Sequence, residues 1–380
     1  DTHSEELKRG ITIRLGYADA SFYKCPDCEE PQCYSTRETC PRCSGKTQFL
    51  RRVSFIDAPG HESLMATMLS GANIMDGAVL LVSATEECPQ PQTREHLMAL
   101  QIIGIKDVVV VQNKVDLVSE NKSKENYQQI KKFLKDTPFK DIPIIPVSAQ
   151  HGANIDILIW AFETYLKTPV RNPKEDSLMY VARSFDVNKP GDDPCSINGG
   201  VLGGSMVDGR IQLHDQIEIR PGRKVEKDGR TDYIPLTTTV AGLITGNIHV
   251  EEITPGGSVG VMTMLDPAIV KSDQLGGSVV GHPGKLPPTL REFALDVHLL
   301  DRVVGLKEEL TVEPIKLKEM LMITVHTAST VGVVSQLGKG KINCILKLPV
   351  CAHVGDRVTI SRRVANRFRL IGYGIIRDKF

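Results

Sequence analysis

The sequence predicts an α/β domain with a doubly wound sheet and a cysteine-rich insertion, followed by two all-β barrel domains. In the first part of the chain, apolar runs rich in Val and Ile alternate with helix-like segments, the pattern of a parallel sheet covered by helices. Beyond about residue 173, short alternating strands recur with Gly, Pro and Asp turns between them, as in β-barrels. A chain of 380 residues is long enough for two or three domains.

Composition and charge limit the class of protein. Hydrophobic residues make up 41% and charged residues 24% of the chain, so disorder is not indicated. The formal net charge is zero, which means that any RNA-binding surface must be a local patch. No apolar run approaches about 18 residues and the first residues are polar. We therefore expect no membrane span and no signal peptide, and a cytoplasmic protein.

The first candidate site follows an apolar run that stops at Asp57 and continues as Ala-Pro-Gly before a helix-like segment. Ligands of parallel α/β sheets bind at the carboxyl edge of the strands, where an Asp can hold Mg²⁺ directly or through a water. Gly60 lets its backbone N–H approach a phosphate closely. Taken alone, a strand followed by Asp-x-Pro-Gly is often only a tight turn.

Two further strands end in polar clusters and strengthen the functional interpretation. The run 108–112 leads into Asn113-Lys114-Val115-Asp116, and the run 144–147 leads into Ser148-Ala149-Gln150. Since parallel strands deliver their carboxyl ends to one edge of a sheet, the three clusters should lie there together. They occur in the order found in guanine-nucleotide-binding GTPases.

The Gly-rich phosphate loop G-x-x-x-x-G-K-[ST] of such proteins is not found in this sequence. In this fold it belongs to the first strand, whereas the sequence opens in a charged, turn-rich segment at residues 1–10. We therefore expect the chain to begin after that strand and loop. The alternative is a GTPase relic that no longer binds nucleotide, which the intact later clusters disfavour.

Two CxxC pairs, Cys25/Cys28 and Cys40/Cys43, can fold toward each other and close a tetrahedral Cys₄ zinc site. The insertion, about residues 24–46, is otherwise polar and has too little apolar content for its own core, so zinc would substitute for one. Four thiolates leave no open position, which makes the site structural. Cys33 is a fifth thiol that is either a bystander or a replacement ligand. We expect metal removal to loosen the insertion and leave the rest folded.

The remaining elements complete the domain plan. Strands are expected at residues 11–17 and 76–84, and helices at 62–75, 92–103, 120–134 and 155–166. Barrel strands are expected at 179–185, 200–207, 216–220 and 259–263, with no convincing helix between them. We place the domains at residues 1–172, 173–285 and 286–380, with the boundaries near Pro-containing stretches.

The last domain ends in a basic run, residues 356–379. It holds seven Lys or Arg against two Asp. Such a run is a solvated face about as often as a contact with RNA or a partner, and the pattern leaves both open. The basic residues are Arg357, Arg362, Arg363, Arg367, Arg369, Arg377 and Lys379.

With three domains in this order, the chain resembles translational GTPases of the elongation factor Tu type over its whole length. Residues 57–72, 87–96 and 183–191, together with the paired CPxC motifs, are similar to the gamma-subunit family of translation initiation factor 2 in its archaeal form. The resemblance implies a GTP-hydrolysing core subunit of a heterotrimer, with the α subunit on the second domain and the β subunit on the first. It also implies delivery of methionylated initiator tRNA to the small ribosomal subunit and the mRNA start complex, with hydrolysis as the release switch.

The resemblance also implies roles at the guanine base. Asp116 would accept from the ring N1–H and the exocyclic amine, and Asn113 would bond the N7/O6 side. Lys114 would pack its stem over the base. Ser148 and Ala149 would approach O6, and the adjoining Gln150 completes this set of cofactor-binding residues.

Four further residues would act at the phosphate end. Thr12 and Asp57 would bind Mg²⁺, Gly60 would meet the γ-phosphate, and His61 would position the attacking water as the catalytic residue. Such hydrolysis depends mostly on positioning and charge stabilisation. GTP or GDP, Mg²⁺ and Zn²⁺ are thus the expected cofactors.

Two alternatives are open at this point. One is another aminoacyl-tRNA carrier of the same architecture, such as elongation factor Tu or the selenocysteine-specific elongation factor, which would not be expected to carry the paired knuckles. The other is a non-hydrolysing scaffold that binds subunits and RNA. The missing phosphate loop gives the scaffold some weight.

Overall fold

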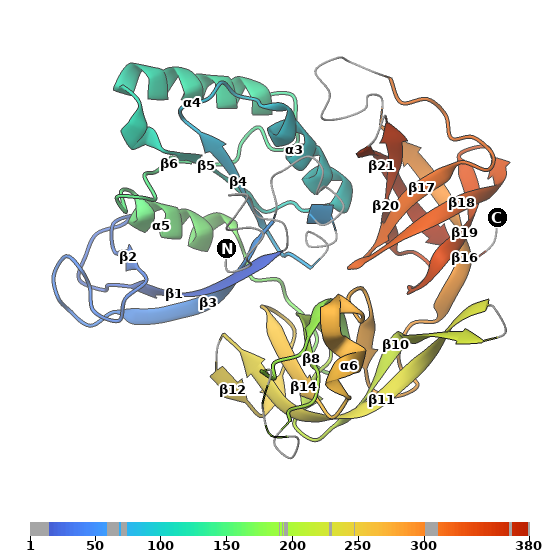
Figure 1. Cartoon of the computed structure of the whole chain (residues 1–380). Coiled ribbons are helices and arrows are strands. Elements are labelled where there is room, and N and C mark those ends of the chain that lie inside the picture. Colours follow the sequence, from blue (N-terminus) through green and yellow to red (C-terminus); the bar gives the residue numbers. More distant parts are fainter. Residues whose placement is uncertain are drawn as a thin grey trace.

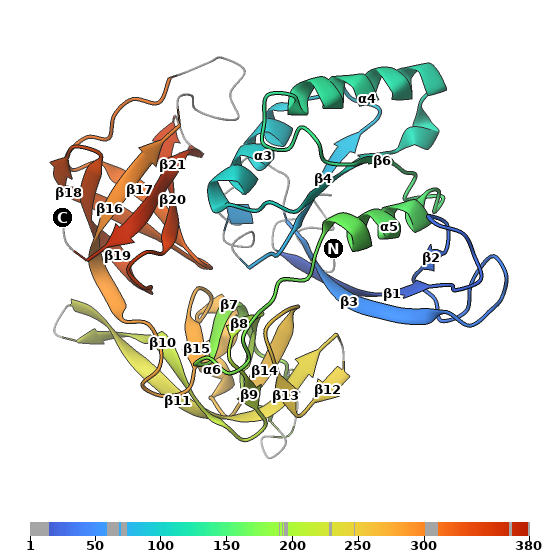
Figure 2. The same cartoon turned by 180° about the vertical axis from the view of Figure 1, so that it is seen from behind.

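The computed structural model describes residues 15–58, 68–69, 74–189, 191, 193, 197–227, 230–246, 248–300, 311–364 and 367–378. An α/β part is followed along the chain by two β-barrels (Figures 1 and 2). This arrangement confirms the predicted fold class. In the described part of the chain, no helix combines the length and hydropathy that a membrane crossing requires.

A parallel sheet lies at the centre of the first domain. Its strands are β4 (Ala78–Ser83), β5 (Val108–Asn113) and β6 (Ile144–Pro146), in the order β4-β5-β6. The strands of β5 and β6 end at the polar clusters predicted from the sequence. Because β5 and β6 are parallel, the loops that follow them leave the same edge of the sheet.

Helices cover both faces of this sheet, which makes the domain doubly wound. α3 (Pro91–Ile103) and α4 (Glu120–Leu134) pack on one face, and α5 (Ile155–Tyr165) packs on the other. Alternate valines of β5 supply the two interfaces, Val108 and Val110 to the first and Val109 and Val111 to the second.

Local signals in the sequence account for the helix ends. The Ser119 hydroxyl accepts a hydrogen bond from the Lys122 N–H and caps the start of α4. α3 ends at Gly104, whose φ of 91° is left-handed and favours glycine. The predicted helix at 62–75 lies mostly outside the described residues. Of its described residues, Met68 and Leu69 lie in a helix, whereas Ile74 and Met75 do not.

An antiparallel sheet carries the insertion. β1 (Gly16–Lys24) lies between β2 (Tyr34–Ser35) and β3 (Gln48–Asp57). The sequence predicted a strand that ended at residue 17, and this extent was wrong. The strand runs on to Lys24 because Phe22, which is 2% exposed, continues its buried face.

The second domain is a closed six-stranded barrel, in the order β10-β15-β7-β8-β14-β11 with β11 pairing back to β10. Short pairs surround it: β12 (Ile248–Val250) on β11, and β9 (Ile211–Gln212) with β13 (Glu252–Ile253). The barrel strands are β7 (Leu178–Phe185), β8 (Val201–Asp208), β10 (Gln216–Lys227), β11 (Arg230–Thr245), β14 (Val259–Thr263) and β15 (Val279–Gly281).

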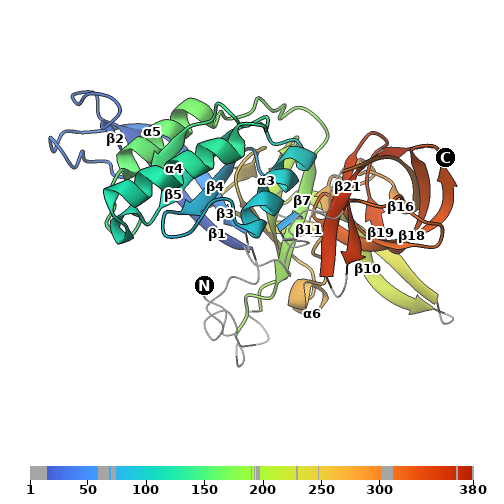
Figure 3. The same ribbon diagram turned by 90° about the horizontal axis from the view of Figure 1, so that it is seen from above.

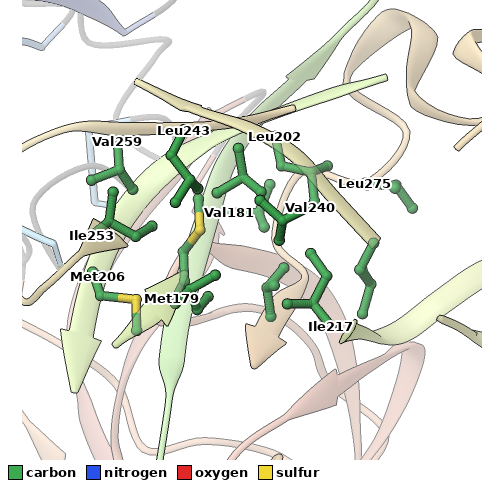
Figure 4. Packing of buried hydrophobic residues seen from close by; sticks show 14 of the residues in the cluster. Met179, Val181, Leu202, Met206, Ile217, Val240, Leu243, Ile253, Val259 and Leu275 are labelled. Carbon is green, nitrogen blue, oxygen red and sulfur yellow. The ribbon is translucent and has the colours of Figure 1, made fainter. Parts of the chain in front are cut away.

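The interior of this barrel is apolar. Met179, Leu202 and Ile217 are fully buried there (Figure 4). A Cβ at Gly204 would lie 1.9 Å from a neighbouring backbone oxygen, so only glycine fits where β7 and β8 approach. The expectation of no helix was wrong, because a four-residue helix, α6 (Pro267–Val270), packs against the barrel.

The third domain is a second closed barrel, in the order β16-β19-β18-β17-β20-β21. Apolar side chains from all six strands fill its interior, among them Leu295, Ile323 and Ile360. Its strands are β16 (Thr289–Leu299), β17 (Met320–Val325), β18 (Ala328–Gly338), β19 (Lys341–Cys351), β20 (Arg357–Val364) and β21 (Arg367–Arg377).

The third domain packs against α3 through the strands β20 and β21 (Figure 3). Arg369, which is 4% exposed, donates to Glu95 at 2.8 Å, and Glu95 is 1% exposed. Arg357 donates to the backbone oxygen of Ile102 at 2.7 Å. Removal of one partner from such a buried pair leaves an uncompensated charge, so the contact fixes the orientation of the two domains.

Several arginines of the basic run at residues 356–379 bond other groups of the chain. Arg362 and Arg377 form ion pairs within the third domain, with Glu319 and Asp296. Together with the two interdomain arginines, four residues of the run bond other groups of the chain itself. These four arginines are therefore bonded within the chain, and contact of the run with RNA or a partner stays a prediction.

Candidate functional site

The end of β5 and the loop after β6 are joined at Asn113. Its side-chain oxygen accepts a hydrogen bond from the Lys114 N–H at 2.8 Å and from the Ala149 N–H at 3.2 Å. Lys114 has a φ of 65°, the left-handed conformation that turns the chain sharply after the strand. One amide thus holds two loops that are distant in sequence.

The loop after β6 is closed by its own hydrogen bonds. Ser148 is 2% exposed and exchanges backbone hydrogen bonds with Ala153, at 3.0 and 3.3 Å. Asn154, with a φ of 62°, donates from its side chain to the Pro146 oxygen at 2.9 Å and precedes the first residue of α5. Ala149 and Gln150 remain exposed at the tip.

Asp116 lies beside this loop. A hydrogen bond from Ser148 holds the pKa of the Asp116 carboxyl below its ordinary value, an effect that partial desolvation opposes and His151 supports. The His151 Nε2 is 3.7 Å from a carboxylate oxygen of Asp116. The carboxylate is therefore ionised at neutral pH and can only accept hydrogen bonds, which suits a ligand edge with two adjacent N–H donors.

A buried amide network under the site was missed in the analysis of the sequence. Gln112, 1% exposed, donates to the Ser123 oxygen and to Asn126, both at 2.8 Å. Asn126 in turn donates to the Glu86 oxygen at 2.7 Å. The network joins the end of β5 to α4 and to the loop after β4. In the sequence, Gln112 directly follows the apolar residues 108–111, and this polar residue in a buried strand could have indicated the network.

Asp57 is the last residue of β3, as predicted, and is exposed. It pairs in register with Gly16, where a Cβ would lie 3.3 Å from the Asp57 Cβ. In the described part of the chain, β3 and the strands β4–β6 belong to separate sheets. Thr12, Gly60 and His61 lie outside the described residues.

The four cysteines of the CxxC pairs come together. All four sulfurs lie within 4.8 Å of one another, with Cys25 to Cys43 at 3.5 Å and Cys28 to Cys40 at 3.8 Å. Sulfurs placed tetrahedrally at about 2.3 Å from Zn²⁺ are about 3.8 Å apart. The arrangement therefore fits a Cys₄ zinc site.

The four sulfurs differ in acidity: burial raises the pKa of the Cys25 thiol and the hydrogen bond with Cys25 raises that of Cys28, whereas Cys40 ionises readily. Backbone N–H groups of Cys43 and Arg42 donate to the Cys40 sulfur and lower the pKa of this thiol to about 6. A thiolate is the form that binds metal. Cys33 stands outside the group of four, is 2% exposed, and has a thiol pKa that burial raises.

The knuckle, residues 24–46, is not an independent appendage. Figure 1 shows β2 beside α5, and Cys33, Tyr34 and Cys40 belong to the same apolar cluster as Ile159 and Phe162 of that helix. The prediction that the insertion has no core was therefore incomplete. Its buried residues pack against the apolar face of α5.

Comparisons with known proteins agree with this architecture. Residues 1–168 match the family model "Elongation factor Tu GTP binding domain", and residues 291–376 match "Initiation factor eIF2 gamma, C terminal". The chain is 60% identical to translation initiation factor 2 subunit gamma of Methanothermobacter thermautotrophicus, over 99% of this chain and 92% of that protein. The identity to the same subunit of Pyrococcus horikoshii is 57%, over 100% and 91%.

A solved structure shares the fold. The bacterial selenocysteine-specific elongation factor EF-Sec superposes with a TM-score of 0.73 at 21% identity. The match covers 99% of this chain and 53% of that chain, so this chain spans about half the length of that factor.

Proposed function

The chain belongs to the gamma-subunit family of translation initiation factor 2, and on that premise we propose that it delivers methionylated initiator tRNA to the small ribosomal subunit under the control of GTP. It is a translational GTPase that binds GTP and takes part in a translation initiation complex. The observation that carries the proposal is the pair of loops that Asn113 joins, with the Asp116 carboxylate beside them.

In the proposed nucleotide complex, the Asp116 carboxylate accepts from the N1–H and the 2-amino group of guanine. Asn113 faces the N7/O6 side, and Lys114 packs along the base. The exposed N–H of Ala149, with Ser148 and Gln150 beside it, approaches O6. An adenine base has no N1–H donor, so the ionised carboxylate rejects it.

At the phosphate end, we assign Asp57 and Thr12 to Mg²⁺, Gly60 to the γ-phosphate and His61 to the attacking water. Asp57 is the last residue of β3, which supports this assignment only in that the carboxylate stands at the end of a strand. Mg²⁺ would neutralise developing charge on the phosphates, and His61 would orient the water rather than react covalently.

We assign a structural Zn²⁺ to Cys25, Cys28, Cys40 and Cys43. The sulfur distances and the donors to Cys40 support it. We further propose domains at residues 1–172, 173–285 and 286–380, since α5 ends at Tyr165 and β15 ends at Gly281. In the cytoplasm, the α subunit would bind the second domain and the β subunit the first, at the mRNA start complex.

Binding measurements on the full-length protein test this function. We expect micromolar or tighter binding of GDP and GTP, no competition by ATP, and tighter binding of initiator methionyl-tRNA with GTP than with GDP. A protein that binds partner subunits and RNA but no guanine nucleotide would instead be a scaffold. Equal tRNA affinity with GTP and GDP would contradict a GTP-controlled carrier.

A further inference from the structure

One ion pair connects the cysteine knuckle to the helix that follows the loop at residues 148–154. The Arg42 Nη2 lies 3.1 Å from the Asp156 Oδ2, and these residues are 114 positions apart in the sequence. The other oxygen of the same carboxylate accepts the Ile157 N–H at 2.9 Å, in the first turn of α5. Neither the proposed zinc site nor the proposed nucleotide site uses this pair.

Arg42 is held firmly on the knuckle side. It stands between Cys40 and Cys43 in the sequence, and its backbone N–H donates to the sulfur of Cys40, a residue that is 3% exposed. Tyr34 of the knuckle lies in the apolar cluster that α5 shares. The position of the guanidinium therefore depends on the fold of the knuckle.

Asp156 is close in sequence to the loop at residues 148–154. It follows Asn154 by two residues, and Asn154 bonds the oxygen of Pro146. The backbone bonds between Ser148 and Ala153 close the segment between them. A shift at the start of α5 therefore moves the closed loop as a unit, including the Ala149 N–H that meets Asn113.

We infer that the knuckle is a positioning element for the loop at residues 148–154, and that Arg42 is the positioning residue that acts through Asp156. The part of this inference that concerns guanine affinity rests on the proposed function. The structural path stands without it: Arg42 bonds Asp156, the backbone leads from Asp156 to Asn154, and the loop is closed by the bonds of Asn154 with Pro146 and of Ala153 with Ser148.

The size of the effect follows from exposure. The Arg42 side chain is 55% exposed and that of Asp156 24%, so solvent screens the pair. An ion pair of this kind contributes about 0.2–1 kcal/mol, which converts to an increase of about 1.4-fold to fivefold in Kd. Loss of the whole knuckle should exceed this range, because the packing of Tyr34 on α5 is lost with it.

The experiment compares the full-length protein with Arg42→Ala, Asp156→Asn and the double variant. Asp156→Asn keeps an acceptor for the Ile157 N–H and loses the charge. Lys46→Ala is the matched control, since it removes a cation from an exposed position in the same knuckle. Zinc content, the Kd for a fluorescent GDP, and amide hydrogen exchange of residues 148–154 are measured for each.

We expect both single variants to keep one zinc, to raise the Kd about 1.4-fold to fivefold, and to speed exchange at residues 148–154. The double variant should be no worse than either single one, because they break the same contact. Lys46→Ala should match the natural protein. Removal of zinc by a chelator should speed exchange at residues 148–154 as well as at 24–46.

Three results would overturn the inference: additive single variants, an equal effect of Lys46→Ala, or chelation that loosens residues 24–46 alone. Failure of the natural protein to bind guanine nucleotides would refute the proposed function instead. Hydrogen exchange would still test the link between knuckle and loop in that case, because it needs no nucleotide.

Discussion

The loops of the proposed nucleotide site and the cysteine knuckle rest on one apolar cluster, but they are held by different means. The loops leave the ends of buried strands, and Asn113, Asp116 and Ser148 tie them with side-chain hydrogen bonds. The knuckle spans residues 24–46 with only a two-residue strand, and its four sulfurs converge within 4.8 Å of one another. A loop that continues a buried strand is positioned by that strand, whereas a long insertion needs a cross-link between its own residues to hold one conformation.

The two regions should therefore respond differently to the loss of a single contact. The loops should tolerate loss of a single bond and lose ligand affinity, since the sheet beneath them persists. The knuckle should lose its structure as a unit, because structural zinc sites contribute folding free energy directly.

The largest effect is expected from Cys40→Ser. Loss of one thiolate should abolish tight zinc binding and remove hydrogen-exchange protection across residues 24–46, while β4, β5 and β6 stay protected. Zinc content and exchange mass spectrometry measure both. Cys33→Ala is the control and should keep its zinc, since Cys33 lies outside the group of four. Full zinc retention by Cys40→Ser would contradict the assignment of this ligand.

Asp116→Asn should change the base that is bound. The amide offers one acceptor and one N–H donor, which no longer matches the two donors of guanine but matches the N1–H and C2 oxygen of xanthine. We expect GDP affinity to fall about 100-fold or more and xanthosine diphosphate to become the better ligand. Competition titrations measure this. Unchanged preference for GDP would place the base elsewhere.

Asn113→Ala should weaken nucleotide binding without unfolding the domain. It leaves the N–H groups of Lys114 and Ala149 without their acceptor, which costs about 1–3 kcal/mol. The Kd for GDP should rise about fivefold to 150-fold. Asn121→Ala, at an exposed position on α4, is the control. Equal affinities of the two variants would show that the link between the loops is unimportant for binding.

The smallest effect is a change in pH dependence with Ser148→Ala. The Ser148 hydrogen bond is the main cause of the lowered pKa of Asp116. Because the ionised carboxylate binds guanine, a lowered pKa extends binding to lower pH, and binding is lost as pH falls through it. Removal of the hydroxyl should move this acid limb to higher pH. Nucleotide titrations across the acidic range check it, and coincident profiles would contradict the role of Ser148.

Much of the molecule could be predicted because its signals are local. α4 was placed at residues 120–134 and occupies Glu120–Leu134, and β14 was placed at 259–263 and occupies Val259–Thr263. Spacing alone indicated that four cysteines would converge. These features depend on strand alternation, helix periodicity and short chain loops, all of which neighbouring residues determine.

Other features involve partners that the sequence does not place together. Nothing in residues 356–379 showed that Arg369 would be buried against Glu95 or that Arg357 would bond the end of α3. The network of Gln112 and Asn126 and the pair of Arg42 with Asp156 also join distant segments. Such contacts depend on how whole domains and elements pack.

The order of domains, the polar residues at the strand ends and the convergence of the four cysteines could be predicted from the sequence, because each follows from a repeat or spacing along the chain. What these parts contact is visible only in the folded chain: Asn113 holds the loop of Ala149, the knuckle shares the core of α5, and two arginines of the basic run bond residues of α3. The reason is that contacts between distant segments depend on packing in three dimensions, which local periodicity does not encode.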